Sequence, residues 1–166
     1  MKKKSRLAQL VLLSLLIGVP CAVPLASAAE TKTQNRALSV AKATRLLQES
    51  GYTHRKTGEY TWFIPKQGAS RFALLVAAGE DYLVVGIIVA EKKNIKSSPD
   101  LSFKLLKLNH ALDYVKCGFD DDDDLFVRIE DRIRVIDLPA FKAMVEGVIK
   151  GADQAYETVR PSLIAP

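Results

Sequence analysis

The sequence SPDLSFKLLKLNHALDYVKCGF, residues 98–119, predicts a capped helix that leads directly into a strand. Ser98 is suited to be the N-cap, and Pro99 is tolerated at the first helical position because its missing N–H needs no partner there. Four leucines follow at spacings of four, three and four residues, so they share one stripe: Leu101, Leu105, Leu108 and Leu112. The helix therefore has a face that must pack on the rest of the chain.

Two further apolar residues, Phe103 and Leu106, widen the apolar arc of this helix, which allows two of its sides to be covered. Asn109 lies at the edge of the leucine stripe, and a half-buried amide needs hydrogen-bond partners. We therefore expect the Asn109 side chain to bond to nearby backbone, where the helix passes into the strand.

The segments on either side predict an antiparallel sheet with helices packed against it. The strand patterns cover residues 59–64, 71–78, 82–90, 114–119 and 125–130, and further helices are expected from an N-cap at Ser39 to Gly51 and from an N-cap at Asp137 to Pro161. The order α-β-β-β-α-β-β-α favours an α+β fold with five strands. Residues 82–90 are apolar at almost every position, so that strand should be central and covered on at least one face.

The N-terminus has the pattern of a secretory signal peptide. A cationic start is followed by an apolar run from Leu7 to Val19 and by small residues at Ala26 and Ala28, which predicts cleavage after Ala28. The alternative is an uncleaved membrane anchor, but the apolar run is short for a bilayer span. We expect a flexible N-terminus at 29–37, one domain at 38–160 and a tail at 161–166. The protein should then be bacterial and exported, either periplasmic or secreted.

Cleavage would remove most of the basic character of the chain. The whole sequence carries a formal net charge of +5, and loss of the signal with its four cationic residues would leave 138 of the 166 residues with a net charge of +1. This balance argues against nucleic acid as a partner. The Glu80–Asp81 pair between two apolar strands argues against a membrane span in the mature chain.

Cys117 would be the single cysteine after cleavage, so no intramolecular disulfide could form. Its thiol is either buried as a small apolar group or exposed and able to pair between chains, and burial is favoured because cysteine is among the most buried residue types. A thiol–imidazole pair of Cys117 with His110 has no supporting motif. His54 lies in a polar turn and adds no zinc site. We therefore expect no catalytic residues, no cofactor and no metal site, and a protein that is not an enzyme.

The acidic run of residues 120–124, DDDDD, has two interpretations. Clustered carboxylates can bind a cation such as Ca²⁺, but an EF-hand loop needs spaced ligands, a glycine at its sixth position and a distal glutamate. Here Leu125 takes the position of the glycine. A solvated hairpin turn, which aspartate suits, is the favoured interpretation.

Four aromatic residues of the first strands are candidates for a partner-binding surface: Tyr60, Trp62, Phe63 and Phe72. An uncovered aromatic patch would mark a protein-binding site. The alternative, which is favoured, is that these residues belong to the core.

The local sequence resembles the YbjN family, which shares the fold of type III secretion chaperones of the Tir-chaperone kind. The similarity lies in LLQESGY at 46–52, in LLKLN at 105–109 followed by KCGFD at 116–120, and in LFVR at 125–128 after the acidic turn. It covers roughly residues 38–160. The resemblance implies a fold without a known active site, often dimeric, that holds other polypeptides.

These observations lead to one functional hypothesis and one alternative. The hypothesis is a non-enzymatic, exported, chaperone-like module that binds a protein or peptide and can form a homodimer. The alternative is an envelope protein that binds a small ligand or a cation.

Overall fold

The computed structural model describes residues 26–68, 70–96 and 98–164, and for residues 26–31 it describes the backbone alone. In chain order the elements are α1 (Ala26–Ser50), β1 (Arg55–Lys56), β2 (Thr61–Ile64), β3 (Leu74–Ala78), β4 (Tyr82–Ala90), η1 (Lys92–Asn94), α2 (Pro99–Ala111), β5 (Lys116–Phe119), β6 (Leu125–Arg132), η2 (Ile133–Val135), α3 (Leu138–Val159) and η3 (Arg160–Ser162).

The strands form one antiparallel sheet in the order β1-β2-β3-β4-β6-β5. The predicted α+β class is confirmed, but the sheet formed by the described residues has six strands and not five. The additional strand is β1, which lies in the predicted turn after α1 and pairs Arg55 with Phe63. Two residues are too few to produce a hydrophobic alternation, so the sequence pattern does not indicate this strand.

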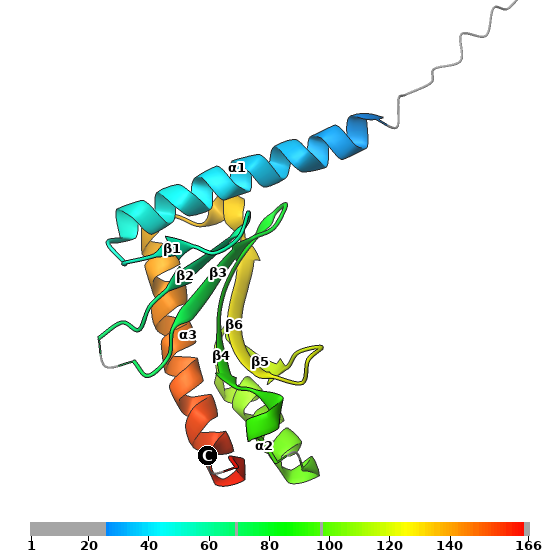
Figure 1. Cartoon of the computed structure of the whole chain (residues 1–166), viewed down its shortest axis with the longest axis vertical. Helices are drawn as coiled ribbons and strands as arrows, with labels where there is room; N and C mark the ends of the chain where they lie inside the picture. The colour runs from blue at the N-terminus through cyan, green and yellow to red at the C-terminus, as the bar shows by residue number, and fades with distance from the viewer. Residues whose placement is uncertain (1–25, 69, 97, 165–166) are drawn as a thin grey trace, which may run out of the picture.

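The three helices surround the sheet in different ways (Figure 1). Helix α3 runs along the sheet and packs on β4 and β6, α1 lies across one end, and α2 lies at the other end against α3 and β5. The N-terminal half of α1 projects beyond the sheet. None of the helices in the described ranges is long and apolar enough to cross a membrane.

The core lies between α3 and one face of the sheet. Strand β4 shows the alternation expected for this position, with Leu83, Val85 and Ile87 buried. The central place predicted for residues 82–90 is confirmed. Because successive side chains of a strand point to opposite faces, the other apolar residues of β4 lie on the side away from α3.

Helix α2 begins and packs as its sequence predicts. The Ser98 hydroxyl accepts a hydrogen bond from the Leu101 N–H at 3.1 Å, and Pro99 occupies the first turn. Leu101 and Leu105 are buried, and Leu108 and Leu112 are half-buried. Phe103 and Leu106 are exposed, so the second apolar side of this helix is uncovered in the single chain.

Helix α1 is longer than the sequence analysis expects. It begins at Ala26, so residues 29–37 are helical rather than loose, and Ser39 is not an N-cap. The segment is rich in alanine, lysine, glutamate, glutamine and arginine and contains no glycine or proline, which favours continuation of the helix. The Ser39 hydroxyl instead donates a hydrogen bond to the Glu80 carbonyl oxygen at 2.7 Å, which ties α1 to the β3–β4 turn.

The predicted signal peptide lies mostly outside the described residues, which begin at Ala26. The expected cleavage site after Ala28 falls within the first turn of α1.

Candidate functional site

The four predicted aromatic residues do not form one surface. Trp62 is 2% exposed and lies in the core, whereas the half-buried Phe63 lies on the opposite face of β2 with the Arg55 guanidinium 4.7 Å from its ring centroid. Phe72 is half-buried and packs edge-to-face on the Tyr156 ring at 6.0 Å. Tyr60 is half-buried beneath α1, beside Arg36.

The sheet face away from α3 carries an apolar surface that no helix of the described chain covers. We call it the open sheet face, and its residues are Leu75, Ala77, Val84, Gly86, Ile88 and Phe126. Leu75 and Ile88 are 46% and 40% exposed, although both lie on central strands. A shallow hollow of about 170 Å³ lies among these residues. The surface is therefore apolar, contiguous and built on rigid strands.

Arg128 is the cation beside this apolar surface. Its guanidinium lies 4.8 Å from the Phe126 ring centroid, and its Nε is buried without a hydrogen-bond partner in the described part of the chain. The adjacent Glu130 is 3.7 Å from the guanidinium, at the outer limit of an ion pair. Gly86 makes room for Arg128, because a Cβ at Gly86 would lie 3.3 Å from the Arg128 Cβ.

Of the four predicted aromatic residues only Phe63 lies on the same side as the open sheet face, opposite Leu75 in the β2–β3 ladder. A second signal in the sequence also points to this face. Residues 82–90 are apolar on both faces of β4, with Val84 and Ile88 on the side away from the core. A helix could have covered those residues, and the sequence pattern does not show whether one does.

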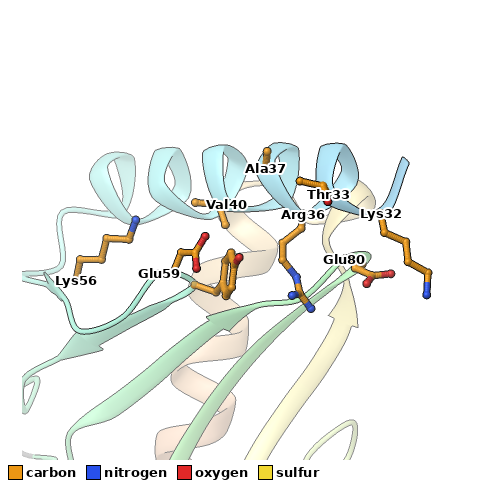
Figure 2. A pocket seen from close by; sticks show the side chains of 9 residues that line it. Lys32, Thr33, Arg36, Ala37, Val40, Lys56, Glu59 and Glu80 are labelled. Carbon is orange, nitrogen blue, oxygen red and sulfur yellow. The ribbon is translucent and has the colours of Figure 1, made fainter. Parts of the chain in front are cut away.

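A second hollow, of about 410 Å³, lies between α1, the β1–β2 turn and the turn that joins β3 to β4 (Figure 2). Arg36 points from α1 into it, toward the sheet, and Lys32, Lys56, Glu59 and Glu80 line its sides. The Arg36 Nε is buried and has no hydrogen-bond partner within the described residues. The charges of both signs make this a polar hollow, unlike the open sheet face.

The acidic run forms a hairpin turn between β5 and β6, as the favoured interpretation predicts. The Asp120 carboxylate accepts hydrogen bonds from the N–H groups of Asp122 and Asp124, at 3.1 and 2.9 Å. Lys92 pairs with Asp123, and its backbone N–H donates to Asp124 at 2.8 Å. No cluster of three or more metal-ligating side chains occurs in the part of the chain that the structure describes.

The predicted burial of Cys117 is confirmed. Burial raises the pKa of the Cys117 thiol above its ordinary value of 9.0, and the thiol lies 3.7 Å from the Leu105 carbonyl oxygen. His110 is exposed at the end of α2, so the structure separates the solvent-facing imidazole from the buried thiol. His54 bonds through Nδ1 to the Tyr52 carbonyl oxygen at 2.9 Å.

Asn109 does what its position predicts. Its Nδ2 donates to the Cys117 carbonyl oxygen at 2.6 Å, and its Oδ1 accepts from the Cys117 N–H at 2.8 Å. The amide therefore occupies both outward-facing backbone groups of Cys117 on the edge strand β5.

No protein-family model and no curated protein matches the sequence. Solved structures do match. One chain of the heterodimeric complex ExoU–SpcU, from the type III secretion system of Pseudomonas aeruginosa, superposes with a TM-score of 0.57 at 20% identity, over 71% of this chain and 98% of that one. One chain of the HopA1–SchA chaperone–effector complex gives 0.56 at 14% identity, over 72% and 97%.

YbjN from E. coli gives a TM-score of 0.57 at 14% identity, over 75% of this chain and 95% of that one. The chain has the type III secretion chaperone fold that YbjN shares. The fold that the local sequence resemblance implies is therefore confirmed. At these identities the likeness concerns the arrangement of the backbone, and the surfaces of this chaperone-like fold must be judged from its own residues.

Proposed function

We propose that this protein is a non-enzymatic, chaperone-like module that binds a protein or peptide partner over the open sheet face. One observation carries the proposal: the central strands β3 and β4 present Leu75 and Ile88 to solvent. Exposed apolar surface that is contiguous and rimmed by polar residues is typical of protein interaction sites. Two of the matched structures are complexes of two proteins, which is consistent with such a role for this fold.

The unpaired Nε of Arg128 favours a polypeptide partner over a purely apolar ligand, because a polypeptide can offer a hydrogen-bond acceptor. A buried guanidinium nitrogen without a partner costs free energy, and that cost is relieved when an acceptor binds. A backbone carbonyl or a carboxylate of an apolar polypeptide segment would supply the acceptor beside the Phe126 ring. The partner we propose therefore combines apolar side chains with an acceptor opposite Arg128.

A photo-crosslinking amino acid at Ile88 tests this proposal in the expressing bacterium. We expect crosslinks at Ile88 to one or a few discrete polypeptides. The control places the same amino acid at Gln48, which is exposed on α1. Identical products from the two positions, or none from Ile88, would contradict the assignment of the open sheet face.

We further propose that export and self-association belong to this function. The cationic start, the apolar run and the small residues around Ala28 support a periplasmic or secreted location in a bacterium. The uncovered apolar side of α2, with Phe103 and Leu106 exposed to 57% and 66%, supports a homodimer. Fractionation of cells that express the protein, with N-terminal sequencing of the product, tests the location.

The hollow beneath α1 favours a second candidate, binding of a small anionic ligand. Its observation is the buried, unpaired Nε of Arg36 with Lys32 and Lys56 nearby. Thermal shift of the purified protein against a panel of carboxylates and phosphates tests it. Stabilisation that disappears in Arg36→Met but persists in Ile88→Glu would favour this candidate over the first.

A further inference from the structure

Strand β6 has an unpaired length of edge at Glu130, beyond the end of β5. Its partner β4 pairs with it as far as Arg132, whereas β5 pairs with it only as far as Arg128. If the pairing of β5 with β6 continued in the same register, Tyr114 would lie opposite Glu130. Tyr114 has a φ of 61° and is 93% exposed, so the chain turns away before that pair can form.

The backbone groups of Glu130 face this gap. In an antiparallel ladder, alternate residues direct their N–H and C=O groups to the two neighbouring strands. The Ile133 N–H bonds to the Asp81 carbonyl oxygen on the β4 side, and the Asp120 N–H bonds to the Asp124 carbonyl oxygen on the β5 side. Odd-numbered residues of β6 therefore face β4, and Glu130 faces the missing strand.

The other edges of the sheet are already protected. On β5 the Asn109 amide occupies the outward N–H and C=O of Cys117. The opposite edge is β1, which has only two residues, Arg55 and Lys56. Short length and positive charge are features that discourage strand addition. Among the described strands, Glu130 has a backbone N–H and C=O that face no neighbouring strand, and there is room beside them for another strand.

A hollow of about 450 Å³ adjoins this edge. Its floor contains Val115, Ile129 and Met144 together with small residues of α3, and Asp113 and Asp131 lie at its rim. The backbone of Glu130 also lines it, whereas the Glu130 side chain points to the other face of the sheet, toward Arg128. No lysine or arginine lines it, so the charged side chains beside the apolar floor are the two aspartates, Asp113 and Asp131. A strand residue placed opposite Asp131 would point to the same side of the sheet as Ile129, toward α3 and into this hollow.

We propose that this edge binds an extended, basic polypeptide segment as a short added strand. One residue of the segment exchanges backbone hydrogen bonds with Glu130, its neighbour inserts an apolar side chain into the hollow, and flanking lysines or arginines face the acidic rim. The Glu130 side chain reaches Arg128 beside the open sheet face, but the backbone edge and the hollow lie toward α3, so this binding does not depend on the function proposed for the open sheet face.

Synthetic peptides test the proposal by titration of the purified full chain. The probe is the acetylated, amidated pentapeptide Lys-Leu-Lys-Val-Lys, with its glutamate analogue Glu-Leu-Glu-Val-Glu and a version N-methylated along its backbone as comparisons. We expect the basic peptide to bind about tenfold more tightly than either comparison, which corresponds to the loss of one or two hydrogen bonds or charge contacts. Equal affinity for the N-methylated peptide would overturn strand addition, and equal affinity for the acidic peptide would overturn the charge assignment.

Two variants locate the site. Glu130→Pro removes an N–H that is outside the β4 ladder, so the sheet should tolerate it, and Glu130→Ala is its control because it removes the side chain but keeps the N–H. We expect the proline variant to lose at least about fivefold more affinity than the alanine variant. Ala143→Phe, at an exposed residue that lines the hollow, should also abolish binding.

Hydrogen exchange of the Glu130 amide in the unaltered protein gives a readout that does not depend on any variant. Exchange should slow by at least about tenfold on saturation with the basic peptide. An unchanged Glu130 amide in the peptide-saturated protein would overturn the proposal. If Ile88 gives no crosslinks but the basic peptide still binds at Glu130, the function proposed for the open sheet face is contradicted and the strand-addition proposal stands.

Discussion

Two glycines in α3 mark where the helix lies closest to the sheet. A Cβ added at Gly151 would lie 2.8 Å from the Val115 Cγ1 and 3.2 Å from the Val127 Cγ1. The two glycines are Gly147 and Gly151, and each costs about 1 kcal/mol of helix stability relative to alanine. Their presence in a helix suggests that another part of the chain packs close to the backbone there. The structure identifies those neighbours as side chains of β6 and of Val115, which directly precedes β5.

We expect Gly151→Ala to destabilise the protein by about 1–2 kcal/mol, because overpacking outweighs the gain in helix propensity. Urea denaturation measures the change. Gly147→Ala is the matched control, since its nearest contact is the flexible end of Ile129 at 3.1 Å, and it should be neutral or stabilising. Val115→Ala should restore stability to the Gly151→Ala protein, and a failure to do so would contradict this contact as the cause.

Cys117 is predicted to be unreactive in the folded protein. Burial raises the pKa of its thiol and shields the sulfur, so at pH 8 the native protein should react with a disulfide reagent much more slowly than the chain in denaturant. The unfolded thiol releases its proton at lower pH than the folded one, so this residue contributes less to stability as the pH rises above about 9. Stability curves of the native protein and Cys117→Ala should therefore converge at high pH.

Asn109 connects two elements, α2 and β5, through one side chain. Asn109→Ala would leave the N–H and C=O of Cys117 unpaired at a half-buried position. We expect a loss of about 2–3 kcal/mol in the free energy of unfolding. His110→Ala, at the exposed neighbouring residue, should change stability by less than about 0.5 kcal/mol. A similar loss in both variants would contradict a specific role for the amide.

The second apolar side of α2 is predicted to mediate self-association. Leu106→Glu should leave folding intact, because the side chain is exposed in the single chain, but should shift the protein from dimer to monomer in light scattering. Ser102→Glu adds the same charge to an exposed position of the same helix and should leave the dimer in place. A native protein that is monomeric at all concentrations would contradict the prediction.

Within the described residues, helix α3 covers one side of the sheet and no helix covers the other. A fluorescent dye that binds apolar surfaces should therefore bind the folded protein, and binding should fall several-fold in the double variant Leu75→Glu with Ile88→Glu. Leu38→Glu is the control, because Leu38 is 64% exposed on α1, away from the open sheet face. Leu75, Ile88 and Leu38 are all partly exposed. The free energy of unfolding should therefore change by less than about 1 kcal/mol in both the double variant and the control.

Local chemistry was sufficient to predict most of the elements. The cap at Ser98, the leucine stripe, the cap at Asp137 and the apolar central strand β4 arise from residues close in sequence, and all appear in the structure. The pairing of Asn109 with backbone was predictable for the same reason. The start of α1 and strand β1 were missed because helix propensity in a polar segment and a two-residue strand leave weak patterns.

Residues 98–119 alone thus specify a capped helix, a packing stripe and a following strand, because those features depend on hydrogen bonds and periodicities within a few turns. Tertiary structure decided that Trp62 is core while Phe63 faces away, and that none of the described helices covers Leu75 and Ile88. It also decided that the turn at Tyr114 leaves the Glu130 backbone unpaired on one side. Each of these outcomes depends on which distant segments lie against a given face or edge, and the period of a single strand carries no information about what covers it.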